Sequence, residues 1–135
     1  MAIIRVEAKV KADIKAVWNK WTKAEHVVHW NFASPDWECP QAENDLKEKG
    51  VFDYRMQAKD GSFGFNFTGK HLRIVPFQLI ESELDDGRSM KVSFEKQGNE
   101  VLVIEEFEAE SINSIELQKQ GWQAILDNFA KYASN

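Results

Sequence analysis

Polar side chains set among large apolar residues in the middle of the chain are the first candidates for chemistry. Tyr54 shares strand parity with Phe52 and Met56, so its hydroxyl is expected to enter any cavity that these side chains line. A backbone carbonyl would satisfy that hydroxyl if the tyrosine is simply buried. His71 is the candidate base for Tyr54. Gly69 leaves open which face of the sheet the His71 side chain lies on, and an imidazole at the surface is the simpler interpretation. The polar residues best placed to orient a ligand are Tyr54, His71, Arg55, Arg73, Asp36, Glu38 and Glu105.

Two histidines, His26 and His29, have a spacing that can place both imidazoles on one metal ion. The nearest further ligands are Asp36, Glu38 and Cys39, which follow in a segment without regular periodicity. The chain contains neither a Cys-x-x-Cys nor a His-Glu-x-x-His pattern. The sequence therefore predicts no metal site.

Cys39 is the single cysteine, and its neighbours Trp37 and Pro40 supply no cation that would lower its pKa and make it a nucleophile. The chain also lacks a phosphate-binding glycine loop and a nucleophile elbow. We find no catalytic signature and predict no cofactor, so an enzyme is the less favoured reading. An acidic run near the end of the last expected strand is interpreted as a solvated face, and it comprises Glu105, Glu106, Glu108 and Glu110.

The composition predicts one domain that spans residues 1–135. Hydrophobic residues make up 43% and charged residues 29%, which is ordinary for a globular protein, whereas nine Phe and five Trp are a generous aromatic supply. A formal net charge of −5 with no basic run argues against nucleic acid and anionic membranes as partners. The lone cysteine, the lack of a signal-peptide layout and the lack of a long apolar run predict a cytoplasmic, non-membrane protein.

A long amphipathic helix is expected over residues 113–132, packed on a sheet. Asn113 is its predicted N-cap, with Glu116 placed to reach back. Gly121 lies at the edge of the apolar stripe, where either close packing or a space beside the helix would explain it. The stripe consists of Ile115, Trp122, Ile125, Leu126, Phe129 and Ala133.

Apolar alternation predicts a first strand over residues 2–11. Asp13 then caps a short helix with an aromatic face, and the capping-box pattern from Thr22 to Glu25 starts a second short helix that carries His26 and Val27. Residues 30–44 show no periodicity, so the large side chains of this loop are expected to cover a core or a pocket mouth.

Six further strands are predicted after this loop, joined by short turns such as Asp60-Gly61. The apolar parity changes near Gly69, which indicates a bulge or a bend there, and Pro76 ends that strand. Short turns imply an antiparallel meander. The predicted ranges are 43–49, 52–58, 63–75, 77–84, 88–96 and 100–108.

These elements predict an α+β helix-grip fold, in which a curved antiparallel sheet of about seven strands wraps around the long C-terminal helix. A curved sheet and a straight helix diverge towards one end, so a cavity for a small molecule is expected between them. The alternative is that the same side chains simply fill the core. The candidate ligand-binding residues are Trp18, Trp21, Trp30, Phe32, Trp37, Phe52, Tyr54, Met56, Phe65, Phe67, His71, Phe94, Gly121, Trp122, Ile125 and Phe129.

The order of elements and several short stretches resemble the SRPBCC helix-grip superfamily. Within it, the chain resembles the branch similar to the C-terminal domain of the activator of the heat-shock chaperone ATPase. Members of the superfamily bind sterols, lipids, polyketides or other hydrophobic molecules, and a few are cyclases. The resembling stretches are VWNKWT (17–22), WNFASPDW (30–37), FDYRM (52–56), DGSFGFNF (60–67), IVP (74–76), DGR (86–88) and QGW (120–122).

Three functions follow from this reading. The first is binding of a small hydrophobic or aromatic ligand in the cavity. The second is cyclase- or dehydratase-like acid–base chemistry there, with Tyr54 and His71 as candidates. The third, implied by the resemblance, is a contact with a chaperone through residues 30–39 or the acidic face. A homodimer contact is a further partner that the sequence leaves open.

Overall fold

The computed structural model describes residues 2–134, and its elements follow the predicted order. The strands form one seven-stranded antiparallel sheet in the order β1-β7-β6-β5-β4-β3-β2, so β1 pairs with the last strand and the others form a meander. The elements are β1 (Ile3–Val10), α1 (Ile14–Thr22), α2 (Ala24–Val27), β2 (Trp37–Asn44), β3 (Val51–Ala58), β4 (Gly64–Val75), β5 (Leu79–Leu84), β6 (Ser89–Gln97), β7 (Glu100–Glu108) and α3 (Ile115–Ala133).

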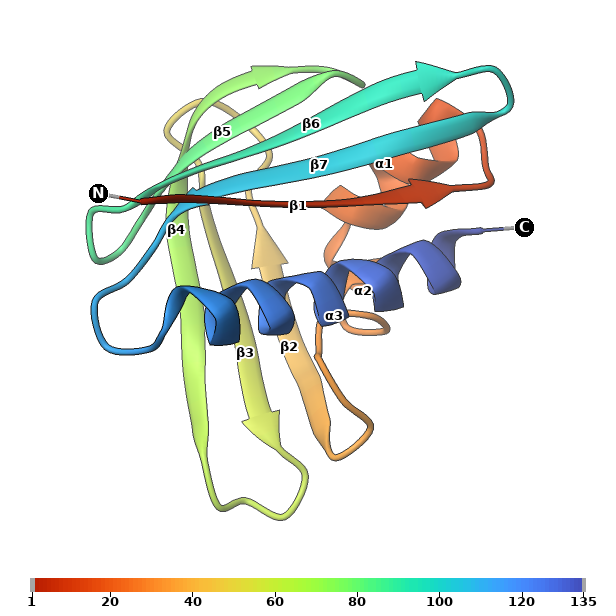
Figure 1. Cartoon of the computed structure of the whole chain (residues 1–135). Helices are drawn as coiled ribbons and strands as arrows, with labels where there is room; N and C mark the ends of the chain where they lie inside the picture. Colours follow the sequence, from red (N-terminus) through yellow and green to blue (C-terminus); the bar gives the residue numbers. More distant parts are fainter. Residues whose placement is uncertain (1, 135) are drawn as a thin grey trace.

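Figure 1 shows how strongly the sheet curls, because β1, β7 and β6 run across the direction of β4, β3 and β2. The long helix α3 lies beside β1 and passes over the concave side of the sheet. Antiparallel sheets of this size twist, and the helix covers the apolar inner face that the twist creates. The predicted α+β helix-grip architecture is confirmed.

The C-terminal half of α3 packs tightly against the sheet and α1. Leu126, Phe129 and Ala133 are fully buried there. The rings of Trp21 and Trp30 stack with centroids 4.8 Å apart, and Phe129 meets their edges at 4.9 and 4.8 Å. Aromatic pairs in such geometries add to the area that they bury. This end of the grip is a filled core.

The N-cap of α3 is Ser114 rather than the predicted Asn113. The Ser114 hydroxyl accepts a hydrogen bond from the backbone N–H of Leu117 at 3.1 Å. The Asn113 amide instead donates to Glu110 at 3.0 Å, which removes it from the capping position. Ile115, predicted on the buried stripe, is 47% exposed because the first turn of α3 lies at the open end of the grip. Among residues 2–134, no helix is long and apolar enough to cross a membrane.

The two short helices follow the predicted positions with one correction. Asp13 caps α1, as predicted, by accepting from the backbone N–H of Ala16 at 2.8 Å. Thr22 does not cap α2, because its hydroxyl donates to the carbonyl of Trp18 at 2.8 Å and is already occupied. The second helix therefore begins after Lys23 without a side-chain cap.

The edge strand β2 differs most from its predicted position. It covers Trp37–Asn44, within the segment predicted to be irregular, and not residues 43–49. Pro40 hid this strand, because proline cannot donate to a sheet ladder. The structure accommodates it at a sheet edge, where the register shifts between Glu38 and Gln41.

The irregularity of β4 lies between His71 and Arg73, two residues beyond the predicted position at Gly69. Gly69 is required for a different reason, since a Cβ there would lie 2.6 Å from the ring of Phe52. The glycine thus allows the close approach of an aromatic ring from the neighbouring strand β3.

Candidate functional site

A cavity of about 640 Å³ lies between the curled sheet and the N-terminal half of α3. Its size falls within the range typical of small-molecule sites. It borders most of the predicted ligand-binding residues, namely Trp21, Trp30, Trp37, Phe52, Tyr54, Met56, Phe65, Phe67, His71, Gly121, Trp122 and Ile125.

Four predicted ligand-binding residues do not line the cavity. Trp18 and Phe94 pack edge to face with centroids 5.2 Å apart, and both belong to the filled core. Phe129 lies in the same core beneath the C-terminal half of α3. Phe32 is half-buried in the connection that precedes β2. Sheet parity alone did not separate the filled end of the grip from the open one.

Aromatic side chains gather where the cavity opens to solvent. Trp37 lies 6.0 Å from Phe63 and 6.2 Å from Phe65, measured between ring centroids. Phe63 is 62% exposed and Leu117, on the first turns of α3, is 57% exposed. All four side chains line the cavity, and they form its mouth. Phe63 and Leu117 were missed, although Phe63 shares the parity of Phe65.

Gly121 decides between the two explanations that its position left open. A Cβ built on Gly121 would have no heavy atom within 4 Å, although the residue lies inside α3 and lines the cavity. The glycine therefore faces open space rather than a closely packed neighbour. A neighbouring side chain, Trp122, stacks on Phe107 of β7 with centroids 3.7 Å apart and closes one wall.

His71 is buried in the cavity wall, so the interpretation as a surface imidazole is wrong. Its Nε2 lies 2.7 Å from Oδ1 of Asn44, and its Nδ1 lies 3.0 Å from the hydroxyl of Ser82. Asn44 donates from Nδ2 to the carbonyl of Thr22 at 2.7 Å, so its Oδ1 must accept from Nε2–H of His71. Ser82 then donates to Nδ1, and the imidazole is neutral. Burial lowers the pKa of His71 and favours this form.

Tyr54 points into the cavity, as its parity predicted. Burial is the main cause that raises the pKa of its hydroxyl well above the ordinary value of 10.0, and the negative charge of the Cys39 thiolate, once formed, raises it further. The hydroxyl forms no hydrogen bond to other residues of the described chain. His71 cannot serve as its base in this arrangement, because both ring nitrogens are already bonded.

Glu105 is the functional candidate that the sequence analysis undervalued. Its side chain is 4% exposed and lines the cavity, so the interpretation of the acidic run as a solvated face is wrong at this position. Glu106 points to the other face of β7, where it pairs with Lys91 at 3.6 Å. Burial raises the pKa of Glu105 from its ordinary value of 4.5 to about 8. Val103 and Phe107, buried at the same parity, were the signal that could have found it.

The remaining polar candidates do not reach the cavity. Arg55 follows Tyr54 in β3 and therefore faces the opposite side of the sheet. Arg73 lies beyond the register shift in β4 and forms an exposed ion pair. The partners that these side chains have instead are Asn66 for Arg55, Glu81 for Arg73, Ser34 for Asp36 and Gln57 for Glu38.

The two histidines both contact Tyr132. Nδ1 of His26 lies 2.7 Å from the hydroxyl of Tyr132, and His29 stacks on the ring of the same tyrosine. Within residues 2–134 there is no group of three or more His, Cys, Asp or Glu side chains suited to a metal ion. Cys39 is buried, which raises the pKa of its thiol to about 11, so the thiolate that nucleophilic chemistry needs is disfavoured. The cytoplasmic location that this cysteine suggested stays a prediction.

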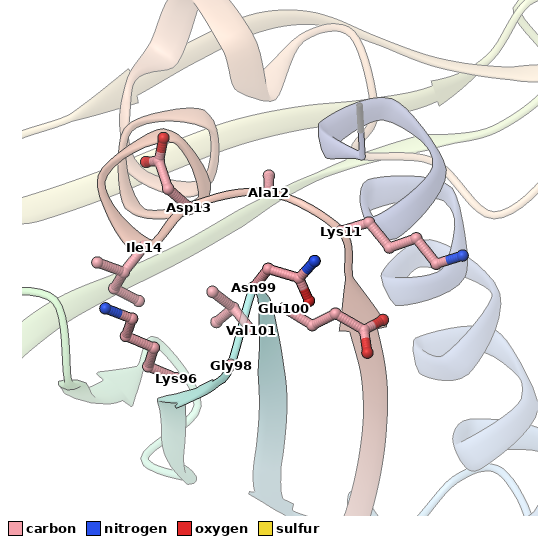
Figure 2. A pocket seen from close by; sticks show the side chains of 9 residues that line it. All are labelled: Lys11, Ala12, Asp13, Ile14, Lys96, Gly98, Asn99, Glu100 and Val101. Carbon is pink, nitrogen blue, oxygen red and sulfur yellow. The ribbon is translucent and has the colours of Figure 1, made fainter.

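A second depression, of about 720 Å³, lies between the start of α1 and the turn that joins β6 and β7. Figure 2 shows the side chains of Lys96 and Lys11 extending to opposite sides of it. Both are polar surface residues, and the depression contains no buried titratable side chain. The cavity under α3 is therefore the stronger candidate site.

A curled antiparallel sheet that grips a C-terminal helix over a cavity defines a helix-grip protein of the SRPBCC superfamily. The family profile described as "Activator of Hsp90 ATPase homolog 1-like protein" matches residues 11–134, and the chain belongs to that family. No protein with curated annotation matched the chain significantly.

Solved structures agree with this assignment. The AHSA1-like protein from Aeromonas hydrophila is 39% identical, with a TM-score of 0.91 over 97% of this chain and 91% of that chain. Chr148 from Cytophaga hutchinsonii is 43% identical, with a TM-score of 0.84 over 96% of this chain and 90% of that chain. Protein NE0264 from Nitrosomonas europaea shares the fold, with a TM-score of 0.81 at 14% identity, over 96% of this chain and 92% of that chain.

Proposed function

We propose that the protein binds a small apolar or aromatic ligand in the cavity between the sheet and α3. The observation that carries this proposal is the open space of about 640 Å³ beside Gly121, within walls formed mainly by apolar side chains, many of them aromatic. A largely apolar space of this kind gains free energy when an apolar ligand fills it, since no protein atoms contact the walls there. The exposed aromatic mouth provides an entry route.

The test is titration with N-phenyl-1-naphthylamine, a weakly basic apolar dye that is uncharged near neutral pH and fluoresces when it leaves water. Wild type is expected to bind it at one site, and Gly121→Leu is expected to lose at least about tenfold in affinity because the new side chain fills the cavity. Gln120→Leu is the matched control, since it adds the same side chain to the exposed face of α3. Equal binding by wild type and a folded Gly121→Leu variant would contradict the proposal.

Native mass spectrometry of freshly purified protein provides an independent test. A stoichiometric apolar companion that is released on unfolding would support ligand binding and would reveal its chemical class. The occupied nitrogens of His71 argue against the alternative in which Tyr54 and His71 act as an acid–base pair.

A chaperone contact is the second candidate function. The family takes its description from an activator of the Hsp90 ATPase. In addition, Ile112 is 88% exposed and stands with Ile115 and Leu117 at the start of α3, which provides apolar surface for a protein partner. The test is stimulation of a purified Hsp90 ATPase by the wild-type protein. An unchanged ATPase rate would remove this candidate.

A further inference from the structure

A carboxyl group without a protein partner borders the cavity. Glu105 is 4% exposed, and it forms neither a hydrogen bond nor an ion pair with any residue from 2 to 134. Every fully shielded side-chain nitrogen or oxygen among these residues has a hydrogen-bond partner. The carboxyl oxygens of Glu105 therefore face the open space of the cavity rather than packed protein.

The neighbours of Glu105 on the inner face of the sheet are all apolar. Val6 of β1 and Val92 of β6 are its partners in the strand register, and Val103 and Phe107 lie two residues before and after it on the same face of β7. From the helix side, Trp122 stacks on Phe107. A buried carboxyl in such surroundings is costly unless a partner compensates it.

The other titratable and charged groups around the cavity do not supply that partner. The guanidinium of Arg88 donates to Asp86 at 2.8 Å, and Glu110 is bonded to the backbone that precedes α3. His71 is held neutral in its hydrogen-bonded cluster. Tyr54 is a neutral phenol whose raised pKa keeps it protonated. No protein cation is therefore directed at Glu105 from the elements described.

We propose that the ligand is a small aromatic or apolar amine, whose protonated nitrogen pairs with the carboxylate of Glu105. This inference rests on the proposed function, because it specifies what binds in that cavity. Folding has already removed most of the carboxyl's contact with bulk water, so the ligand adds an attractive partner, at the cost of desolvating its own nitrogen and of releasing the carboxyl's proton. The aromatic walls favour an ammonium group as well, whereas an anionic ligand would be repelled.

Binding of the amine has a proton balance that can be measured. Burial raises the pKa of Glu105 to about 8, so in the free protein at pH 7 the carboxyl carries a proton. When a protonated amine enters, the carboxyl O–H bond breaks, its proton passes to the buffer, and the carboxylate pairs with the ammonium group. About one proton is released for each amine bound at pH 7. A ligand without charge releases none.

The experiment uses three probes with one aromatic skeleton: 2-(1-naphthyl)ethylamine, 2-(1-naphthyl)ethanol and 1-naphthylacetate. Affinities are measured by calorimetry at pH 7 in two buffers of different ionisation enthalpy, which also gives the number of protons released. Wild type is expected to bind the amine at least about tenfold more tightly than the alcohol, and the carboxylate least. Glu105→Gln is expected to abolish the preference for the amine and its proton release, and to retain the alcohol. The matched control is Glu106→Gln on the outer face of β7, which should behave as wild type.

The outcomes separate this inference from the proposed function. If the alcohol binds as tightly as the amine, or if Glu105→Gln keeps the preference, the amine inference is wrong while cavity binding stands. If the carboxylate binds best, the inference is equally wrong. If none of the three probes binds to wild type, both proposals fail.

Discussion

Two buried titratable groups border the cavity three strands apart, His71 on β4 and Glu105 on β7. Both ring nitrogens of His71 are bonded, to Asn44 and Ser82, and the amide of Asn44 continues the chain to a backbone carbonyl. Glu105 has only apolar partners in the neighbouring strands, Val6 of β1 and Val92 of β6. The histidine is part of a completed hydrogen-bond network that holds β2, β4 and β5 together. Glu105 has no hydrogen-bond partner in the described part of the protein, and this difference is why we assign the ligand to Glu105.

The two groups also shift stability in opposite directions with pH. The folded pKa of Glu105 lies above its unfolded value, so its penalty on stability grows as pH rises from about 4.5 to about 8. The folded pKa of His71 lies below its ordinary value of 6.5, so folding favours its neutral form. That contribution is complete above about pH 6.5 and is lost as pH falls through the folded pKa.

The largest expected effect is that of Glu105→Gln on stability at alkaline pH. At pH 9 the free energy of unfolding of the variant should exceed that of wild type by up to about 5 kcal/mol, because the substitution removes a buried charge. The difference should shrink towards pH 5. Urea unfolding at pH 5, 7 and 9 measures it. Glu106→Gln provides the control and should follow wild type within about 0.5 kcal/mol. Parallel wild-type and Glu105→Gln curves would show that the carboxyl has a partner after all.

His71→Leu should act in the opposite sense and cost about 2–4 kcal/mol. The change leaves Oδ1 of Asn44 and the hydroxyl of Ser82 buried without their partner. The loss is expected to be greatest above pH 6.5, where the neutral imidazole contributes fully. Denaturant unfolding at pH 7.5 measures this loss. An unchanged free energy of unfolding would mean that the hydrogen bonds of His71 do not stabilise the fold.

Gly121→Leu should raise the free energy of unfolding by up to about 1 kcal/mol, because glycine inside a helix is unfavourable and a Cβ at this position meets no heavy atom within 4 Å. Gly69→Ala is the contrasting variant, since its Cβ would meet the ring of Phe52 at 2.6 Å. Thermal unfolding compares the two. A destabilised Gly121→Leu would indicate that the space beside α3 is closed.

Tyr54→Phe has the smallest expected effect, less than about 1 kcal/mol, because the hydroxyl has no hydrogen-bond partner in the described chain. Tyr54 thus resembles Glu105, and not His71, in being an unsatisfied polar group at the cavity. Urea unfolding at pH 7 measures the change. A loss above about 2 kcal/mol would place Tyr54 with the completed network instead.

Several features of the cavity wall could be predicted from the sequence. Strand parity placed Tyr54 in the cavity wall, and the unusual glycine at position 121 indicated a special environment on α3. The acidic run hid Glu105, because four glutamates within six residues read as surface although Val103 and Phe107 have its parity. His71 was uncertain since the register shift in β4 changes which side chains face inward, and its position depends on hydrogen bonding to β5.

By itself, the sequence determined the order of the elements, the antiparallel meander, the long helix and the aromatic supply. These depend on periodicity, turns and caps, whose causes lie within a few residues along the chain. Only the tertiary structure decided that β2 tolerates Pro40, that Trp18 and Phe129 fill the core, and that Glu105 has no partner. Each of these depends on which faces of distant segments meet in the curled sheet, and the free energy of burial is set by that meeting rather than by the local pattern.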